Sequence, residues 1–399
     1  MFKNVYPREK YLNRIRPFYD SDIIKVITGI RRCGKSFILR SIMNELLERG
    51  IEEKQIIYIP LDRRGYKNIK TPEELELKIE SMLGKEDKYY LFIDEVQNVF
   101  GFESVVHAYA EEGYSIFITG SNSYLLSDEI STKLTGRYLN FETFTLDFSE
   151  YLDMKSFFKK DINQDLYLEF DDIPTRQTYT RGIISEIFEK DVKTRKKIRN
   201  VPVYERVQAF LLNNYSAPFS LNNLLKCLEM EGYKTKATTV RGYIEDLKKA
   251  KIVDECNRFD LKSKTAIKRD QKYYLSDMAI YFAVNTDNRL SFGPSLENIV
   301  YLYLASHDYQ ISIGKIGKLE CDFIVRKRNG DYAYIQVAYT LQGEDIKATE
   351  HIKEREYRPF REIRDGYPRY IISLDKFRDQ QEGVHHINAI DLFLGKEKI

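Results

Sequence analysis

The sequence predicts an α/β protein with more than one domain. Segments typical of strands and helices alternate over residues 1–150, the order expected for a parallel sheet with helices on both faces. Residues 201–276 combine three helices, Val203–Asn214, Leu221–Glu231 and a third from Thr238 or Thr239 to Lys249, with two strand-like runs, the pattern of a winged helix. Residues 277–399 again mix helices and strands, which predicts a second, smaller α/β domain.

The first domain is expected to hold five strands with helices between them. The expected strands are Ile23–Thr28, Gln55–Leu61, Tyr89–Ile93, Ser115–Thr119 and Tyr138–Leu146, and the expected helices are Ser36–Arg49, Pro72–Leu83 and Glu103–Glu112. Ligands of such sheets bind beyond the carboxyl ends of the strands. Residues 151–200 are interpreted as a helical linker or lid.

A phosphate-binding loop follows the first strand. Residues 29–36 read GIRRCGKS, which fits G-x-x-x-x-G-K-[ST], between a strand and a helix as this motif requires. The backbone N–H groups of such a loop, and the following helix N-terminus, attract phosphate. Lys35 is expected to reach the β- and γ-phosphates, and Ser36 to ligate Mg²⁺. The predicted nucleotide contacts are Gly29, Ile30, Arg31, Arg32, Cys33, Gly34, Lys35, Ser36 and Phe37.

Two carboxylates end the strand that begins at Tyr89. Asp94 is expected to hold Mg²⁺, and Glu95 to act as a general base toward the attacking water. Without the phosphate-binding loop, the same pair would be interpreted as solvated acids at a strand end.

Two further polar residues are candidates for this site. Asn122, in the run Gly120-Ser121-Asn122-Ser123, is the first choice for a side chain beside the γ-phosphate, with Ser121 or Ser123 second; the alternative is a helix cap. Arg137 is a candidate to stabilise the transferring phosphoryl group, and the alternative is a surface arginine after a turn glycine.

The segments GIRRCGKS, LFIDEVQNV, ITGSNSYLLS and LTGRY resemble the prokaryotic AAA-type ATPases (AAA_14) that are fused to a DUF4143 region. This resemblance covers nearly the whole chain. It implies a P-loop NTPase sheet of the additional-strand type, in which a sensor strand lies between the two motif strands. It also implies Glu95 as the catalytic acidic residue, Arg137 as an arginine finger, and ATP with Mg²⁺ as cofactors. The sequence has no guanine-specific N/TKxD motif, which favours ATP over GTP.

Composition limits the classes of partner. Among 399 residues, 63 Lys and Arg face 61 Asp and Glu, so any surface for nucleic acid must be local. No apolar run reaches the length of a membrane span, and the charged N-terminus does not resemble a signal peptide, so a cytoplasmic protein is expected. The four cysteines are scattered and predict neither a zinc site nor a disulfide framework.

The predicted winged helix carries basic residues where such folds contact DNA. Lys234, Lys236, Thr238, Thr239 and Arg241 lie at the start of its last helix, and Lys262, Lys264, Lys268 and Arg269 lie on the expected wing. The alternative is a winged helix that binds a protein and never contacts DNA. The charged run Lys190–Arg199 is interpreted as a solvated helix face, with a DNA-contacting strip as the alternative.

The runs GPSLENIVYLYL, ECDFIV and YIQVAY resemble the DUF4143 region, which is similar to PD-(D/E)xK nucleases. The resemblance implies that Glu297 and Asp322 hold a second Mg²⁺. A lysine is expected two residues after Gln336, where this chain has Ala338. Either a lysine from elsewhere replaces it, with Lys315, Lys318 and Lys347 as candidates, or the domain has lost catalysis and binds a partner.

Three functions remain open on the sequence alone. The chain is expected to be an ATPase whose nucleotide state controls modules that act on DNA. The alternatives are an ATP-gated switch that docks an unknown protein partner, and a DNA nuclease licensed by ATP. A homo-oligomer follows if Arg137 acts on the nucleotide of a neighbouring subunit.

Overall fold

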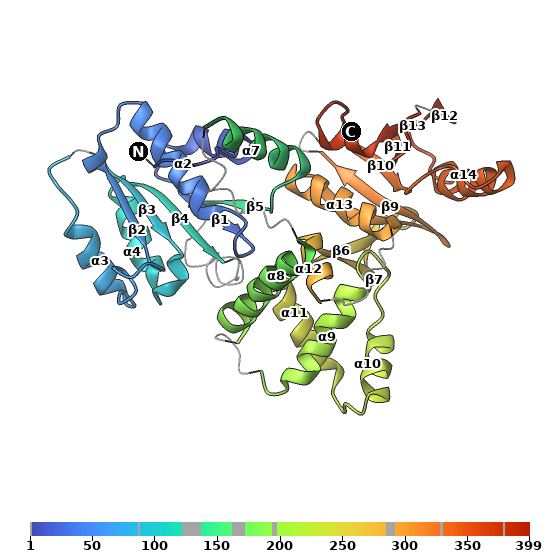
Figure 1. Ribbon diagram of the computed structural model, residues 1–399, viewed down its shortest axis with the longest axis horizontal. Helices are drawn as coiled ribbons and strands as arrows, with labels where there is room; N and C mark the ends of the chain where they lie inside the picture. The colour runs from blue at the N-terminus through green and yellow to red at the C-terminus, as the bar shows by residue number, and fades with distance from the viewer. Residues whose placement is uncertain are drawn as a thin grey trace. The chain divides into compact units, whose positions relative to one another are not determined.

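The structure is a computed structural model that describes residues 2–86, 88–121, 137–161, 172–193, 198–284, 292–327, 330–377 and 380–399 (Figure 1). The chain forms two compact units. Unit 1 comprises Met1–Leu146, Glu150–Glu169 and Lys249–Lys251, and unit 2 comprises Asp147–Ser149, Phe170–Lys248 and Ile252–Ile399. Each unit has its own sheet and its own apolar core.

A five-stranded parallel sheet forms the centre of unit 1. Its order is β2-β3-β4-β1-β5, so β4 separates the two strands that carry the predicted motifs, as the resemblance implies. The bounds are β1 Ile24–Gly29, β2 Ile56–Pro60, β3 Tyr90–Asp94, β4 Ser115–Ser121 and β5 Tyr138–Thr143. The five predicted strands are confirmed, and the largest difference is in β5, which ends at Thr143 rather than Leu146.

Helices cover both faces of this sheet (Figure 1). Their bounds are α1 Glu9–Ile15, α2 Lys35–Glu48, α3 Pro72–Glu80 and α4 Phe102–Glu111. Consecutive strand residues point to opposite faces, which divides the core into two clusters. Ile27 and Phe117 pack with α1 and α2, whereas Val26 and Ile118 pack with α3 and α4. Helix α7, Phe148–Asp161, follows β5 in the chain.

One charged side chain lies inside the sheet of unit 1. Lys25, on β1, is completely buried, and its ammonium donates to the carbonyl of Ser21 and the hydroxyl of Ser115, both at 2.9 Å. The ammonium also lies 4.4 Å from the ring centre of Phe117. These three partners carry no negative charge. Burial, together with the positive charge of Lys88, therefore lowers the pKa of Lys25 to about 7.

We expect Lys25 to make the free energy of unfolding increase as the pH rises from 7 to 9. Unfolded lysine has a pKa of about 10.4, so in this interval the unfolded chain holds a proton that the folded chain has released, and stability increases with pH. Lys25→Met removes this difference and should reduce the rise by roughly 2 kcal/mol, measured by urea unfolding at both pH values. An equal rise in parent and variant would contradict the lowered pKa.

Unit 2 contains the helices that the sequence predicts between residues 201 and 249. Helix α8, Ile173–Ile187, continues into the π-helical turn η5, Phe188–Val192. The following helices are α9 Val201–Asn213, α10 Leu221–Met230 and α11 Ala237–Lys249. The side chains of Asn200 and Ser220 accept hydrogen bonds from the first turns of α9 and α10, which explains where these two helices begin.

An antiparallel hairpin follows α11, formed by β6, Val253–Asp260, and β7, Thr265–Leu275. The hairpin is not a free wing, because β6 also pairs in parallel with β8, Gln310–Ile316. It is thereby the edge of an eight-stranded sheet with the order β12-β13-β11-β10-β9-β8-β6-β7. Residues before and after position 277 therefore share one sheet, and the assignment of a separate winged helix stays a prediction.

The remaining elements of unit 2 complete this sheet and its helical cover. They are α12 Met278–Val284, α13 Phe292–Ser306, β9 Leu319–Arg326, β10 Tyr332–Val337, α14 Ile346–Arg361, β11 Arg369–Ser373, β12 Gln380–Gln381, β13 Val384–Asn388 and α15 Ala389–Phe393. Helix α13 packs on the sheet through Leu296, Val300 and Leu304. Within the described ranges, no helix has the length and apolar character needed to cross a membrane.

Candidate functional site

The predicted phosphate-binding loop leaves β1 at a position where only glycine fits. Gly29 has a φ of +152°, and a Cβ there would lie 2.2 Å from the carbonyl oxygen of Thr143 on β5. Gly34, with a φ of +101°, immediately precedes α2. Both glycines of the motif are thus required by backbone conformation, and the first is also required by close approach. The loop therefore delivers the chain to a helix N-terminus, where first-turn N–H groups attract phosphate.

The side chains of the loop differ in exposure. The Lys35 ammonium is buried and donates to the carbonyls of Gly29, at 3.1 Å, and Ile30, at 3.2 Å, so its charge is held by the loop. Ser36 is half-buried in the first turn of α2. Arg31 is half-buried, whereas Arg32 and Phe37 are exposed.

Cys33 is the buried member of this loop. Burial raises the pKa of its thiol, and the nearby positive charge of Lys35 acts in the opposite direction. The negative charge of Glu95 raises the pKa of this thiol further. A raised thiol pKa does not favour the oxidation-prone thiolate at this position.

A threonine on the strand between the motifs binds the Asp94 carboxylate and the Glu95 backbone. Asp94 is buried at the end of β3, and its two oxygens accept hydrogen bonds from the hydroxyls of Tyr58, at 3.1 Å, and Thr119. The Thr119 oxygen in turn accepts from the backbone N–H of Glu95, at 3.0 Å. Because Thr119 is itself fully buried on β4, the order β3-β4-β1 fixes this arrangement.

Glu95 adopts a left-handed backbone conformation with a φ of +58°, which is rare for a residue with a side chain. This conformation turns the chain directly after Asp94, and Gln97 donates a hydrogen bond to the Glu95 carboxylate. The half-buried Glu95 is therefore held at both its backbone and its side chain. Strained backbone of this kind is concentrated at functional sites.

The other two predicted catalytic residues are less defined. Asn122 lies outside the described residues, as does Ser123. Arg137 precedes β5, and its guanidinium is 59% exposed and lies 3.6 Å from the carboxylate of Glu111 on α4. The role of Arg137 toward a nucleotide therefore stays a prediction.

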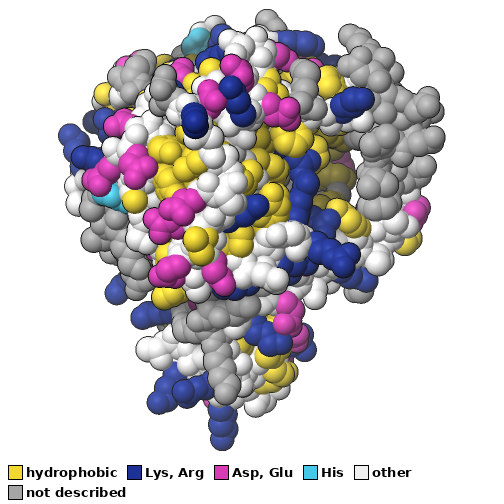
Figure 2. All heavy atoms as spheres, turned by 90° about the vertical axis from the view of Figure 1, so that its left-hand side faces the viewer, with side chains coloured by type: hydrophobic (Ala, Val, Ile, Leu, Met, Phe, Trp, Pro, Cys, Tyr) yellow, Lys and Arg dark blue, Asp and Glu magenta, His cyan; other side chains and the backbone are white. Residues whose placement is uncertain are grey.

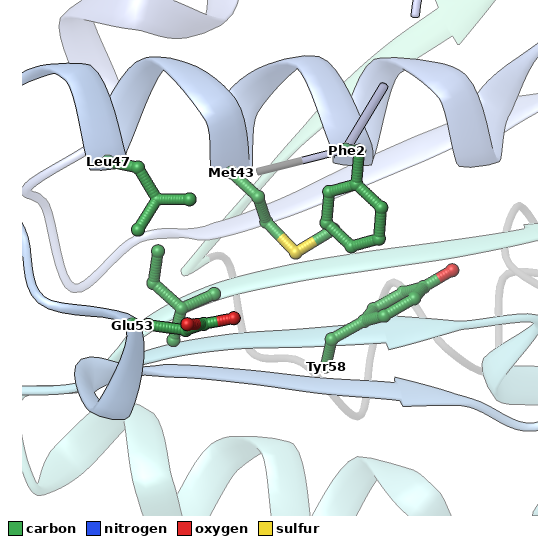
Figure 3. A pocket seen from close by; sticks show the side chains of 6 residues that line it. Phe2, Met43, Leu47, Glu53 and Tyr58 are labelled. Atoms are coloured by element: carbon green, nitrogen blue, oxygen red, sulfur yellow. The ribbon is translucent and has the colours of Figure 1, made fainter. Parts of the chain in front are cut away.

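An apolar pocket lies beneath α2 in unit 1 (Figure 3). Its lining residues are Phe2, Met43, Leu47, Glu53, Ile56 and Tyr58, none of which belongs to the phosphate-binding loop. Phe2 is fixed to α2 because its backbone exchanges two hydrogen bonds with the side chain of Asn44, at 2.7 and 2.9 Å. The pocket meets the candidate site through Tyr58, whose hydroxyl binds Asp94.

Unit 2 brings Glu297 and Asp322 together around a lysine. Lys272, on β7, is only 3% exposed, and its ammonium lies 2.9 Å from Glu297 on α13 and 2.8 Å from Glu320 on β9. Asp322, also on β9, lies 3.9 Å from the same ammonium. Tyr274 donates a further hydrogen bond to Glu297, at 2.7 Å. We call these four charged residues, Lys272, Glu297, Glu320 and Asp322, the acidic cluster.

The charges of the acidic cluster are strongly coupled. Burial alone would lower the pKa of Lys272, but the carboxylates of Glu297, Asp322 and Glu320 outweigh it and raise that pKa. Burial, followed by the charge of Glu297, raises the pKa of Asp322 well above its usual range. The Asp322 carboxylate accepts a hydrogen bond from the backbone of Val337, at 2.8 Å. Lysine thus supplies positive charge at the place where a second Mg²⁺ is expected from the sequence.

Two parts of the chain match known protein families. Residues 21–152 match the AAA domain family (AAA_14), and residues 166–291 match a domain of unknown function (DUF8612). An uncharacterized protein of Haemophilus influenzae is 30% identical over 410 residues, which cover 99% of this chain and 100% of the relative. This chain belongs to the same family as the Haemophilus influenzae protein.

Two archaeal proteins are also similar to this chain. Uncharacterized protein MJ1544 of Methanocaldococcus jannaschii is 29% identical over 399 residues, which cover 92% of this chain and 85% of that protein. The Walker-type ATPase PABY2304 of Pyrococcus abyssi has 17% sequence identity and a TM-score of 0.48, with coverage of 71% of this chain and 96% of that chain. The AAA_14 part of the predicted resemblance is confirmed, and the DUF4143 part stays a prediction.

Sequence reasoning missed several residues of the AAA domain and of the acidic cluster. It placed a polar residue after β4, but did not select Thr119 within that strand. It also named three lysines as substitutes at Ala338, and Lys272 was not among them. The local sequence gives little signal, because Lys272 follows the polar residues Asp270 and Gln271, and its carboxylate partners lie on other elements.

Removing the Lys272 charge is expected to destabilise unit 2. Lys272→Met leaves buried carboxylates without their cation, a change that costs about 3–5 kcal/mol for a broken buried pair. The pKa values of Glu297 and Asp322 are already raised in the folded protein, so the loss should shrink as the pH falls and these groups take up protons. Urea unfolding at pH 7.5 and pH 5 measures both effects.

Lys248→Met is the matched control for this measurement. Lys248 pairs with Glu245 and Glu255, but its side chain is 25% exposed. We expect it to change stability by less than about 1 kcal/mol. Equal stabilities of Lys272→Met and Lys248→Met at pH 7.5 would show that the acidic cluster does not need its lysine.

Proposed function

We propose that the AAA domain binds ATP with Mg²⁺ and hydrolyses it. The observation that carries this proposal is the Thr119 hydroxyl on β4, the strand beside β1, which donates to the Asp94 carboxylate and accepts from the Glu95 backbone N–H. Lys35 and the N-terminus of α2 would hold the phosphates, and Ser36 with Asp94 would hold Mg²⁺. The bound Mg²⁺ would neutralise charge that develops on the phosphate oxygens.

Glu95 would then act on the attacking water. Thr119 fixes the backbone of Glu95, and Gln97 fixes its carboxylate. The carboxylate would therefore already be oriented when it accepts a proton from the water. Fixed orientation of this kind lowers the barrier because no reorganisation is needed during the reaction. Asn122 beside the γ-phosphate, and Arg137 as an arginine finger on its own or a neighbouring nucleotide, stay part of the proposal.

Two substitutions separate binding from turnover. Lys35→Ala should abolish or strongly weaken ATP binding, because the loop loses the ammonium that neutralises phosphate. Glu95→Gln should keep ATP binding and lower kcat by about 10²- to 10⁴-fold, because the amide cannot accept the proton. Binding of a fluorescent ATP analogue and release of phosphate measure the two effects. The exposed Glu76→Gln on α3 is the control, and parental turnover in Glu95→Gln would exclude Glu95 as the base.

We further propose that the nucleotide state controls unit 2 and that unit 2 acts on DNA. Lys234 and Lys236 directly before α11, and Arg241 within it, are exposed, and the described residues offer none of them a carboxylate partner within ion-pair distance. Figure 2 shows Lys and Arg side chains gathered at its lower end, the end at which α9 and α10 lie in Figure 1. Unpaired cations beside a helix that follows a turn suit phosphate contact.

Other basic residues of unit 2 are already neutralised. Lys190 pairs with Glu186 at 2.6 Å, and Lys193 pairs with Glu189 at 3.0 Å, both at i,i+4 spacing along the helical chain. These pairs favour the solvated helix face over the DNA-contacting strip for this part of the chain.

The salt dependence of DNA binding tests this surface. The triple variant Lys234→Ala, Lys236→Ala and Arg241→Ala should weaken binding and reduce the slope of log affinity against log salt by up to about 3, roughly 0.9 per lost phosphate contact. The control is Lys190→Ala with Lys193→Ala, which should bind as the parent does. DNA binding by fluorescence anisotropy at several salt concentrations measures both. Unchanged affinity in the triple variant would shift the proposal to a switch that docks a protein.

The acidic cluster weighs against cleavage of DNA by unit 2. Lys272 supplies one positive charge beside Glu297 and Glu320, and the raised pKa values of Glu297 and Asp322 favour their neutral forms, so less negative charge remains for Mg²⁺ to neutralise. We therefore favour a module that binds DNA without cleaving it over an ATP-licensed nuclease. Gel analysis of DNA incubated with the protein, ATP and Mg²⁺ decides this point: cleavage that disappears in Asp322→Ala would establish the nuclease instead.

A further inference from the structure

An arginine outside every motif binds the phosphate-binding loop. Arg8 precedes α1 and is only 3% exposed. Its NH1 group donates to the carbonyl of Cys33, at 2.7 Å, and to the carbonyl of Phe144, at 2.9 Å, directly after β5. A Cβ added at Gly34 would lie 3.6 Å from the same nitrogen, so the guanidinium also lies against the second glycine of the motif.

The other nitrogens of Arg8 bind the chain that leaves the AAA domain. Nε and NH2 donate to the two carboxylate oxygens of Glu150, at 2.8 and 2.7 Å, and NH2 also donates to the carbonyl of Thr145, at 3.4 Å. Glu150 is buried in the first turn of α7. One rigid, planar side chain thus joins the phosphate-binding loop, the end of β5 and α7.

The hydrogen-bond inventory of Arg8 excludes a direct role at the phosphates. A guanidinium has five N–H groups, and all five have acceptors in this arrangement. Glu150 also neutralises its charge at bidentate geometry. No donor remains for a nucleotide, so any effect of Arg8 on the site must pass through the groups that it holds.

The neighbourhood of Arg8 makes this connection stiff. The guanidinium carbon lies 4.5 Å from the ring centre of Tyr11, and the Tyr11 hydroxyl accepts a hydrogen bond from the backbone of Phe144, at 3.0 Å. Phe144 is therefore held by its N–H and by its carbonyl, from two residues of the same N-terminal segment. A movement of the Cys33 carbonyl must either displace Arg8 or leave buried donors without acceptors.

We propose that Arg8 is a positioning residue that couples the phosphate-binding loop to α7, so that nucleotide bound at the loop restricts the first helix after the AAA sheet. This inference rests on the proposed ATP site. The route runs from the Cys33 carbonyl through the guanidinium to Glu150, a separation of 142 positions between Arg8 and Glu150 in the chain.

Hydrogen exchange of the full chain, with and without Mg²⁺ and the non-hydrolysable analogue AMPPNP, tests this coupling. In the parent, AMPPNP should slow exchange both in residues 29–37 and in residues 150–161. In Arg8→Gln, slowing should persist in the loop but be lost in residues 150–161, a change of about fivefold in exchange rate for one lost buried hydrogen bond. The conservative Arg8→Lys should recover only part of this slowing, because it lacks the bidentate fork.

Glu150→Gln and Arg16→Gln complete the test. Glu150→Gln keeps the Arg8 contact with Cys33 but removes the negative charge on α7, so it should also abolish the slowing in residues 150–161. This variant keeps the proposal testable should Arg8→Gln fail to fold. Arg16→Gln is the matched control, because Arg16 precedes the same sheet but binds Glu9 and Glu45.

The outcomes separate the two proposals. Slowing of residues 150–161 that persists in Arg8→Gln or in Glu150→Gln overturns the coupling. Absence of slowing in the loop of the parent overturns the ATP site itself. A third outcome is that Arg8→Gln loses the slowing of exchange in both segments while Glu150→Gln behaves as the parent does. This outcome would show that Arg8 only supports the loop, and it also overturns the coupling.

Discussion

The contact between the ends of β1 and β5 is the constraint on which the nucleotide site depends. Gly29 pairs with Thr143 in the sheet, and the Thr143 carbonyl leaves no space for a Cβ at position 29. The loop therefore starts against β5, and Arg8 extends this contact by binding both Cys33 and Phe144. Support for the loop thus comes from β5 and the N-terminal segment, neither of which belongs to the phosphate-binding motif.

Four buried cations show how surroundings decide what a charge does. Lys25 has only neutral partners, and burial lowers its pKa to about 7, so its charge is a cost to the fold near neutral pH. Arg8 and Lys272 have carboxylates within hydrogen-bond distance and keep their charge. Among the described residues, Lys35 donates to two loop carbonyls and has no carboxylate partner, which suits it to phosphate.

The parts of the site that lie within one stretch of chain could be predicted from the sequence. The loop, Asp94 and Glu95 are recognisable because a strand, a short motif and a helix follow one another directly. Their supports could not be predicted, since Thr119 lies 25 positions from Asp94 and Arg8 lies 142 positions from Glu150. The five strands were predictable from apolar runs, whereas the pairing of β6 with β8 requires contacts that no local pattern records.

The pairing of β6 with β8 limits how a nucleotide could control unit 2. A free wing would move independently of the C-terminal region, but β6 and β7 belong to the sheet that carries β9 and β10. Lys272 on β7 then binds carboxylates on α13 and β9, which ties the hairpin to that region by charge as well as by backbone hydrogen bonds. Because breaking this link exposes buried carboxylates without a cation, separating the hairpin from the sheet is costly. The proposed signal from the nucleotide would therefore have to act on the hairpin and the acidic cluster together.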